Sequence, residues 1–358
     1  MTTENKPAAV YQHHLQEGLL LNANENSRGL LDVVLEDFLA RVPALQLNRY
    51  PDDDCKSLRQ AYAKHIGVSP DQILAGNGSD QMLQLLISAF ISKDRKLLTL
   101  SPDFSMYDFY TLSYEGKLCK YPILHGSQVH FSLDEFIHQA RDLKPGLILF
   151  SSPNNPTGWQ ISNEELLKLC WAVAPIPVVA DEAYVEFADE SALDILNNTD
   201  NLYITRTLSK AYALAGARVG FLISTRKNIE RLRPYRVVYS VNTLSMALAE
   251  SVLAHAGLFE DMIEKTRAER ERLQQAYGEL PGLEVLPSAA NFLCIAADGD
   301  LLQTIREALE EKQIVLRWYE GKNYVRVTIG TREENDQVLD IFRTCIRQRN
   351  TDSDGSGN

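Results

Sequence analysis

The sequence lacks an excess of positive charge and any long apolar run. Its 358 residues carry 36 Lys and Arg against 48 Asp and Glu, a formal charge of −12. No basic field is therefore available to hold a nucleic-acid backbone or an anionic membrane. No apolar run approaches the roughly 18 residues that a membrane span requires. We expect neither nucleic-acid nor membrane partners, and an anionic ligand must be held locally by a few cations and backbone amides.

Paired cysteines and metal-ligand spacings are also missing. The five cysteines are scattered, odd in number and without a CxxC pair, so reduced thiols are the simplest interpretation. The seven histidines show no HExxH or related spacing, and we predict no metal. The first residues, MTTENKPAAVYQHH, show no basic stretch followed by an apolar one, and so do not predict a signal peptide. We expect a cytoplasmic protein.

Short apolar runs alternate with amphipathic stretches between residues 56 and 224. The amphipathic stretch after residue 161 opens with Ser162 three residues before Glu165, the spacing of a helix capping box. Strands alternating with helices predict an α/β domain with a mainly parallel, buried sheet. In such sheets, ligand groups gather at the carboxyl ends of the strands. The apolar runs of strand length include residues 96–101, 146–152, 177–183, 201–209 and 218–224.

The pattern changes after Ser245, where a long charged helix leads into shorter strands and a last helix near residues 336–347. This predicts a smaller α+β domain with its own core. The tail TDSDGSGN has the composition of a disordered segment. We therefore divide the chain into an N-terminal arm (1–26), a large domain (27–240), a small C-terminal domain (241–350) and a disordered tail (351–358).

Two charged residues stand at the ends of predicted strands. Lys210 directly follows the run ending in Thr-Leu-Ser. A lysine is nucleophilic only when neutral, so its pKa must be lowered from about 10.4 by burial or by nearby cations such as Arg218. Asp181 ends the run PVVAD, where a buried carboxylate requires a cationic or protonated partner. The simpler alternatives are a surface lysine and a helix N-cap aspartate.

Two turns add polar groups at the same strand ends. SPNNPTG holds Asn155 in a rigid turn, able to donate a hydrogen bond to a phenolate-like oxygen. In GNGSD, Ser79 and Asp80 begin a helix whose free N–H groups make an anion site. Gln81 stands where a dinucleotide-binding loop would have its third glycine, which disfavours a hydride-transferring dehydrogenase.

Together, GNGSD, SPDFSMY, SPNNPTG, DEAY, TLSK and LAGARVG resemble, in order and spacing, the motifs of fold-type I aminotransferases. The likeness extends from residue 21 to residue 335. It implies a pyridoxal 5'-phosphate cofactor bonded covalently to Lys210, which would also carry the proton. Asp181 would pair with the pyridine nitrogen, and Tyr184 and Asn155 would bind the 3-oxygen of the ring. Phe104 would stack on the ring, where the family more often has tyrosine. The cofactor phosphate would be held by Ser79, Asp80, Ser209 and Arg218.

Three segments resemble histidinol-phosphate aminotransferases in particular. NANEN at 22–26 and NRYPD at 48–52 are similar to the N-terminal signatures of that family. The resemblance implies a homodimer in which Tyr50 reaches the cofactor phosphate of the other subunit. It also implies that Arg326 pairs with the α-carboxylate of glutamate and that Arg317 helps to bind the substrate phosphate. Asn24 and Asn155 would contact the substrate as well.

The implied reaction, a step of histidine biosynthesis, converts L-histidinol phosphate and 2-oxoglutarate to imidazole-acetol phosphate and L-glutamate. Val238 departs from the family, which often has proline there. The alternatives are an aromatic or broad-specificity aminotransferase, a threonine-phosphate decarboxylase on the same scaffold, and a non-catalytic binding protein with this fold. The presence of Lys210, Asp181 and Arg326 together argues against the last.

Overall fold

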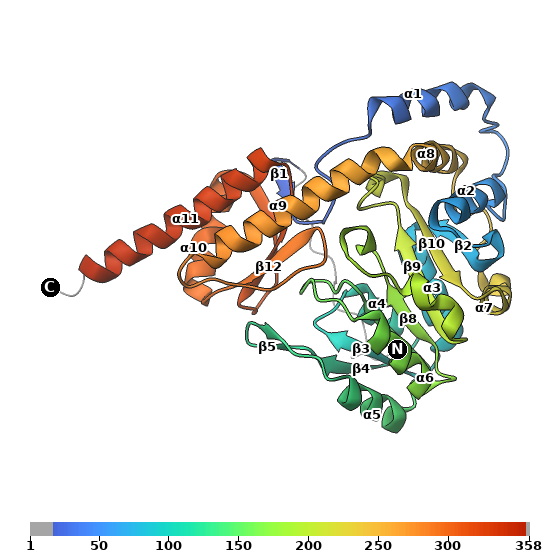
Figure 1. Cartoon of the computed structure of the whole chain (residues 1–358), viewed down its shortest axis with the longest axis horizontal. Coiled ribbons are helices and arrows are strands. Elements are labelled where there is room, and N and C mark those ends of the chain that lie inside the picture. The colour runs from blue at the N-terminus through green and yellow to red at the C-terminus, as the bar shows by residue number, and fades with distance from the viewer. Residues whose placement is uncertain (1–16, 356–358) are drawn as a thin grey trace.

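The computed structural model describes residues 17–355 and contains two main sheets, each at the centre of a separate part of the molecule (Figure 1). The part around the seven-stranded sheet is called the large part, and the part around the five-stranded sheet is called the small part. The sheet of the large part has seven strands, in the spatial order β2 (Ile73–Asn77), β10 (Val219–Ser224), β9 (Leu202–Thr207), β8 (Val178–Asp181), β7 (Leu147–Ser151), β3 (Lys96–Ser101) and β4 (Lys117–Pro122).

The large sheet is parallel from β9 to β4, while β10 runs antiparallel to both of its neighbours. Every residue of β7, β8, β9 and β10 is buried. Near-continuous apolar runs are typical of strands that are covered on both faces. The prediction of an α/β fold with a mainly parallel sheet is confirmed.

Helices cover both faces of this sheet. On one face α3 packs against β2, β9 and β10, and its Met82 and Leu86 join Val179 and Leu222 in one cluster. Side chains of α2, α5, α6 and α8 are buried on the other face. The capping box predicted at Ser162 is present at the start of α6. The helices of the large part are α1 (Asp32–Arg41), α2 (Lys56–Ile66), α3 (Gly78–Phe90), α4 (Met106–Ser113), α5 (Leu133–Leu143), α6 (Asn163–Val173), α7 (Arg226–Leu232) and α8 (Thr243–Ala254).

The small part has a five-stranded sheet and a separate apolar core. The first strand pairs in parallel with β13, and the other pairs are antiparallel. A hairpin of the large part, β5 (Leu124–His125) and β6 (Gln128–Val129), reaches toward this sheet (Figure 1). The strand order is β1 (Leu19–Leu21), β13 (Ile314–Trp318), β14 (Tyr324–Thr328), β12 (Phe292–Ala296) and β11 (Glu284–Val285), and the helices are α9 (Glu260–Gly278), α10 (Gly299–Glu311) and α11 (Arg332–Gly355).

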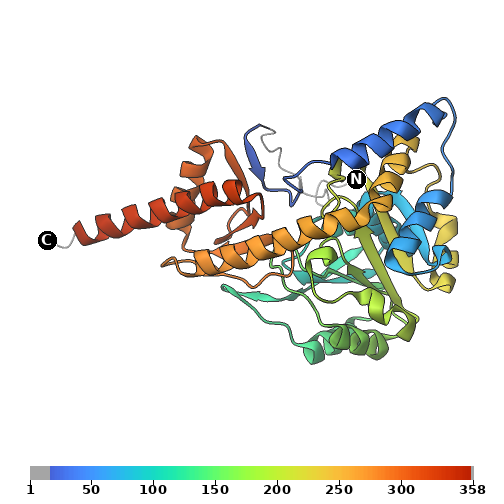
Figure 2. The same ribbon diagram turned by 45° about the horizontal axis from the view of Figure 1, so that its top comes forward.

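The segment boundaries differ from those expected from the sequence. The arm expected at 1–26 contains β1, which is an edge strand of the small sheet, and residues 1–16 lie outside the described residues. The small domain was expected from residue 241, but α8 packs against α1 and α2, and Met246 and Phe259 belong to the large core. The apolar face of α8 thus extends the large part beyond residue 240. Helix α9 then runs from the large part into the small part (Figures 1 and 2).

The C-terminal segment is more helical than expected. Helix α11 continues to Gly355, through most of the tail 351–358 that the sequence predicted to be disordered, and residues 356–358 lie outside the described residues. Within residues 17–355, none of the helices combines the length and apolar character needed to cross a bilayer. The same residues contain no cluster of three or more side chains suited to hold a metal ion.

A buried ion pair ties β9 to the segment that follows β8. The Nε of Arg206 donates to the carboxylate of Glu182 at 2.9 Å, and both side chains are buried. Glu182 also accepts hydrogen bonds from Ala192 and Ser191. Glu186 has one buried carboxylate oxygen that finds no hydrogen-bond partner in the described part of the chain. Burial raises the pKa of Glu186 to about 7, although Arg206 opposes the shift.

We expect Glu186→Gln to stabilise the protein at alkaline pH. In the wild type, stability is lost as pH rises from the unfolded pKa near 4.5 toward the folded value of about 7, because the unfolded chain then binds fewer protons than the folded one. The full loss above pH 7 is about 3 kcal/mol. The melting temperature of the variant minus that of the wild type should therefore be larger at pH 8 than at pH 5. The exposed Glu311→Gln should show no such difference, and equal behaviour of both variants would contradict the prediction.

Candidate active site

The polar residues predicted at strand ends lie together at the carboxyl ends of central strands of the large sheet. Asp181 is the last residue of β8, Asn155 follows β7, and Lys210 follows β9. Because β7, β8 and β9 are parallel neighbours, their carboxyl ends lie side by side. The first turn of α3, with Ser79 and Asp80, starts directly after β2.

Asp181 is buried, with 3% of its surface exposed, and both of its carboxylate oxygens accept hydrogen bonds from neutral donors. The Tyr107 hydroxyl donates to Oδ2 and the Thr205 hydroxyl donates to Oδ1, each at 2.7 Å. Burial raises the pKa of Asp181 to about 6, although these two hydrogen bonds lower it. A cationic ligand group against this carboxylate would favour its ionised form.

Lys210 has the partly neutral amine that a nucleophile requires. Its Nζ donates to the backbone carbonyl of Ala23 at 2.7 Å and lies 6.0 Å from the ring centroid of Tyr184. Burial, followed by the positive charge of Arg326, lowers the pKa of Lys210 to about 8. The sequence suggested Arg218 as the neighbouring cation, but Arg326 has the larger effect.

Two side-chain amides donate hydrogen bonds to Tyr184. Its hydroxyl accepts hydrogen bonds from Asn24 Nδ2 at 3.0 Å and from Asn155 Nδ2 at 3.4 Å. Burial raises the pKa of Tyr184 to about 12, so the phenol stays protonated at neutral pH. A guanidinium N–H of Arg326 donates to Asn155 Oδ1. The structure therefore brings these four residues, predicted on separate motifs, into one hydrogen-bonded group.

The start of α3 forms a cradle for an anion. The Arg218 guanidinium donates to Asp80 at 2.9 Å and to the Ser209 hydroxyl at 3.5 Å. A Cβ at Gly78 would lie 2.6 Å from the Arg218 guanidinium, and one at Gly220 would lie 2.1 Å from the Ser79 amide nitrogen. These glycines let the guanidinium and β10 approach the helix N-terminus, where free N–H groups and a cation together suit a phosphate.

Phe104 lies beside the Asp181 group. Its ring makes an edge-to-face contact with Tyr107 at 5.6 Å between centroids, and Tyr107 reaches Asp181. The preceding Asp103 accepts a hydrogen bond from the Ser151 backbone amide at 3.2 Å. The loop that contains Phe104 is thereby fixed to the end of β7.

Tyr50 is the predicted residue that the structure does not bring to this group. It is 82% exposed and stacks on Tyr239 with ring centroids 4.9 Å apart. Other large apolar side chains from α1, the following loop, the segment before α8 and the first turn of α8 are exposed as well. They are Val33, Leu35, Leu39, Leu47, Tyr235, Val237, Val238 and Leu244.

Two arginines of the small part face the strand ends. Arg317 on β13 and Arg326 on β14 are directly opposite in the antiparallel register, which puts both side chains on the same face of the sheet. Arg326 is buried and donates to Asn155 and to the Asn22 carbonyl, and its Nε has no hydrogen-bond partner within residues 17–355. The guanidinium carbon of Arg317 lies 5.7 Å from the ring centroid of Tyr319.

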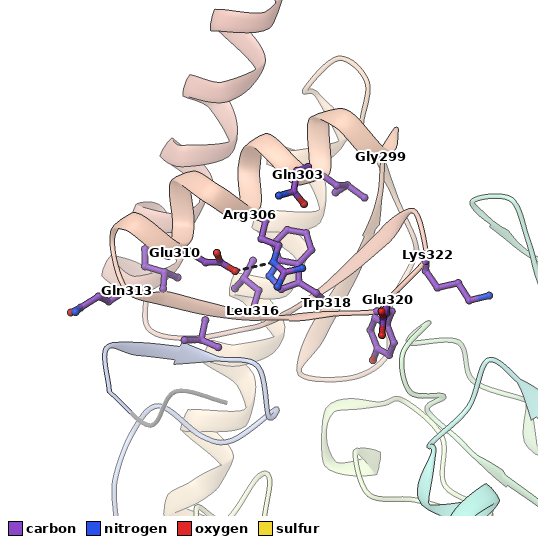
Figure 3. Close-up of a pocket in the computed structure, with 14 residues that line it drawn as sticks. Gly299, Gln303, Arg306, Glu310, Gln313, Leu316, Trp318, Glu320 and Lys322 are labelled. Carbon is purple, nitrogen blue, oxygen red and sulfur yellow. Dashed lines mark hydrogen bonds and ion pairs between the residues drawn. The ribbon is translucent and has the colours of Figure 1, made fainter. Parts of the chain in front are cut away.

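A hollow of the small part lies apart from this group (Figure 3). It is bounded by α10 and β13, and Arg306 pairs there with Glu310 and lies over the Trp318 ring. None of the predicted site residues lines it, although its lining includes Tyr319, two positions after Arg317.

Sequence reasoning missed the donors to Asp181. Thr205 is paired in register with Asp181 across β8 and β9, and a polar residue within an apolar strand was a usable signal. Tyr107 lies one turn after Phe104 in the motif SPDFSMY, but its target, Asp181, is 74 residues away. The Ala23 carbonyl that accepts from Lys210 left no signal, because every residue has a carbonyl.

Comparison with known proteins agrees with this geometry. The model of the family "Aminotransferase class I and II" matches residues 16–342, and the chain belongs to that family. Within it, the chain is 34% identical to a histidinol-phosphate aminotransferase of Clostridium novyi, over 93% of this chain and 92% of that one.

Two solved structures are similar over most of their length. The histidinol-phosphate aminotransferase of Sinorhizobium meliloti, in complex with pyridoxal-5'-phosphate, aligns with a TM-score of 0.82 at 25% identity, covering 92% of this chain and 91% of that one. The L-threonine-O-3-phosphate decarboxylase of Porphyromonas gingivalis shares the fold with a TM-score of 0.77 at 24% identity, covering 92% of this chain and 99% of that one. The protein is a pyridoxal-phosphate-dependent aminotransferase.

The residues present fit pyridoxal phosphate. Asp181 offers a buried carboxylate without a basic side chain among its hydrogen-bond donors, which suits a protonated pyridine nitrogen. Gly78 and Gly220 let the Arg218 guanidinium and β10 lie close to the start of α3, so that a cation and free N–H groups suited to a phosphate stand together. Lys210 has a lowered pKa, as an amine that bonds to an aldehyde requires.

Proposed function

We propose that the protein transfers an amino group between L-histidinol phosphate and 2-oxoglutarate, giving imidazole-acetol phosphate and L-glutamate. The observation that supports it best is the pair of opposed arginines, Arg317 and Arg326, on the face of the small sheet beside Lys210. Like charges directly opposite on neighbouring strands are unfavourable, and an anionic substrate group between them removes that penalty. Both substrates carry such groups.

Arg326 is the binding group for the α-carboxylate of glutamate. Its guanidinium is buried and donates to neutral partners, and its Nε has no acceptor among the residues that the structure describes. A carboxylate can accept two parallel hydrogen bonds from the planar guanidinium group. Arg317, on the same face, is then the cation for the second anionic group, which is the phosphate of histidinol phosphate. Asn24 and Asn155, buried beside Tyr184, complete the substrate contacts.

The chain's own residues orient the reactants and move the proton. Bound pyridoxal phosphate supplies the electron sink. The Lys210 amine would take up and return the proton of the substrate Cα. Asp181 would stabilise a proton on the pyridine nitrogen, and Tyr184 with Asn155 would bind the 3-oxygen of the ring. Ser79, Asp80, Ser209 and Arg218 would hold the phosphate, and Phe104 would cover the ring.

A substrate panel tests this proposal. The purified protein, loaded with pyridoxal phosphate, is given 2-oxoglutarate with L-histidinol phosphate, L-histidinol, L-tyrosine or O-phospho-L-threonine. We expect kcat/KM for the formation of glutamate to be highest with histidinol phosphate as the amino donor. Absence of turnover with histidinol phosphate would refute the proposed substrate. Release of carbon dioxide from phosphothreonine would instead indicate the decarboxylase that shares this fold.

We also propose that the protein acts as a homodimer in which Tyr50 of one chain completes the phosphate site of the other. Tyr50 stacks on Tyr239, and both rings are exposed, as are large apolar side chains of α1 and α8, which pack together; exposed apolar surface of this kind marks protein interfaces. Light scattering should give twice the chain mass of 40.3 kDa. A monomer with full activity would contradict this arrangement.

A further inference from the structure

The two arginines share their face of the small sheet with two tyrosines. Tyr319 lies two positions after Arg317, and Tyr324 lies two positions before Arg326. Side chains two apart on a strand point to the same face, and the rings of Tyr319 and Tyr324 are in contact with centroids 5.1 Å apart. Trp318, between Arg317 and Tyr319, points to the opposite face, where Arg306 of α10 lies over its ring (Figure 3).

Tyr319 is clamped between the two parts of the molecule. It packs against the cluster of Leu286, Cys294, Ala296 and Tyr324 on the small sheet, together with Leu124 and Val129 of the β5–β6 hairpin. At the tip of this hairpin, Ser127 hydrogen-bonds Glu284 of β11. The hairpin extends from β4 at the edge of the large sheet (Figure 1). Contacts from both sides restrict the orientation of the Tyr319 ring.

Tyr319 interacts directly with Arg317. Arg317 is hydrogen-bonded to Tyr319, and its guanidinium carbon lies 5.7 Å from the ring centroid. Burial raises the pKa of Tyr319, although the charges of Arg326 and Arg317 oppose the shift. The neutral phenol therefore accepts from the guanidinium and keeps its own proton for a second acceptor.

Without a hydrogen-bond partner that fixes its orientation, Arg317 would discriminate poorly between substrates. Arginine has a flexible side chain with about 2 kcal/mol of rotamer entropy, and the charge of Arg326 across the strand pair repels it. A fixed acceptor that orients the guanidinium before the ligand arrives reduces both disadvantages. Tyr319 is such an acceptor, and its orientation is set by the hairpin rather than by the ligand.

We propose that Tyr319 is a specificity-determining residue that holds Arg317 in place for the phosphate of the amine substrate, and that the β5–β6 hairpin holds Tyr319. The inference rests on the proposed function, because it assigns the anionic group that Arg317 binds. It makes Tyr319 a positioning residue for binding rather than for proton transfer. Its loss should therefore change substrate preference while the chemical step is retained.

Tyr319→Phe tests the proposal, with Tyr324→Phe as the matched control. Both changes remove one phenol oxygen from the same aromatic cluster, but the hydrogen bond to Arg317 belongs to Tyr319. For the holoenzyme, KM and kcat are measured with L-histidinol phosphate and with L-histidinol, which lacks the phosphate. Inorganic phosphate is also tested as an inhibitor of the conversion of the bound cofactor by glutamate, followed by absorbance.

We expect Tyr319→Phe to raise the KM for histidinol phosphate and the inhibition constant of phosphate by about tenfold, the effect of losing one hydrogen bond to a charged group. The kcat, and the KM for histidinol, should stay near the wild-type values. Tyr324→Phe should leave the ratio of the two amine substrates unchanged. Equal losses for both amines in Tyr319→Phe, or the same change of ratio in both variants, would overturn the proposal.

Failure of the proposed function would be visible separately. If the wild-type enzyme does not convert histidinol phosphate, the proposed substrate is wrong. The inhibition constant of phosphate then tests separately whether Tyr319 positions Arg317. An increase in Tyr319→Phe but not in Tyr324→Phe supports this role, and no increase in Tyr319→Phe overturns it.

Discussion

Lys210→Ala should abolish transamination, with kcat reduced by at least about a thousandfold, the contribution typical of a positioned proton-transfer group. In the proposed mechanism, the variant loses both the group that bonds to the cofactor aldehyde and the base for the substrate Cα. The structure gives this amine the required environment, because burial and Arg326 lower its pKa to about 8. Turnover is measured with glutamate and 2-oxo acid, and borohydride treatment followed by mass spectrometry reports the covalent bond to the cofactor.

Lys210→Arg is the matched control for this prediction. It keeps a positive charge near Tyr184 and the Ala23 carbonyl, but the guanidinium stays protonated at any working pH. Both variants should fold, with thermal midpoints near the wild-type value, and neither should retain the cofactor after borohydride treatment. Retained turnover in Lys210→Ala, or borohydride fixation at another lysine, would refute the assignment of Lys210.

Asp181→Asn should lower kcat by about a hundredfold or more, as expected when one preorganised electrostatic contact is lost. The change removes the charge and keeps a side chain of the same shape that can still accept from Tyr107 or Thr205. In the proposed mechanism, loss of the carboxylate removes the charge that stabilises the proton on the pyridine nitrogen. Steady-state kinetics and titration of the apoprotein with pyridoxal phosphate measure the two effects.

The pH dependence of cofactor binding provides an independent check on Asp181. Since its pKa in the free protein is about 6, protonation below that pH removes the charge that attracts the pyridinium, and the wild-type affinity should fall as pH decreases. Asp181→Asn should lack this fall after correction for the cofactor's own ionisation. Asp108→Asn, which removes a partner of Lys120 one residue after Tyr107, should behave like the wild type. Identical pH profiles for wild type and Asp181→Asn would contradict the proposed contact.

The strands and motifs could be predicted because they depend on local patterns. The run at 96–101 became β3 and the run at 218–224 became β10, since continuous apolar residues suit strands that are covered on both faces. The positions of Asp181, Asn155 and Lys210 at strand ends followed from the same pattern. The end of the large part could not be predicted this way, because α8 is assigned to it by packing against α1 and α2.

The fold class, the order of the motifs and the chemical types at the site follow from the amino-acid sequence alone. Which groups meet depends on the folded chain: Tyr107 and Thr205 at Asp181, Arg326 near Lys210, and Tyr319 beside Arg317. Local propensity acts over a few residues, whereas these contacts join segments that the two sheets and the β5–β6 hairpin bring together. A pKa such as that of Lys210 depends on burial and on distant charges, which exist only once the chain has folded.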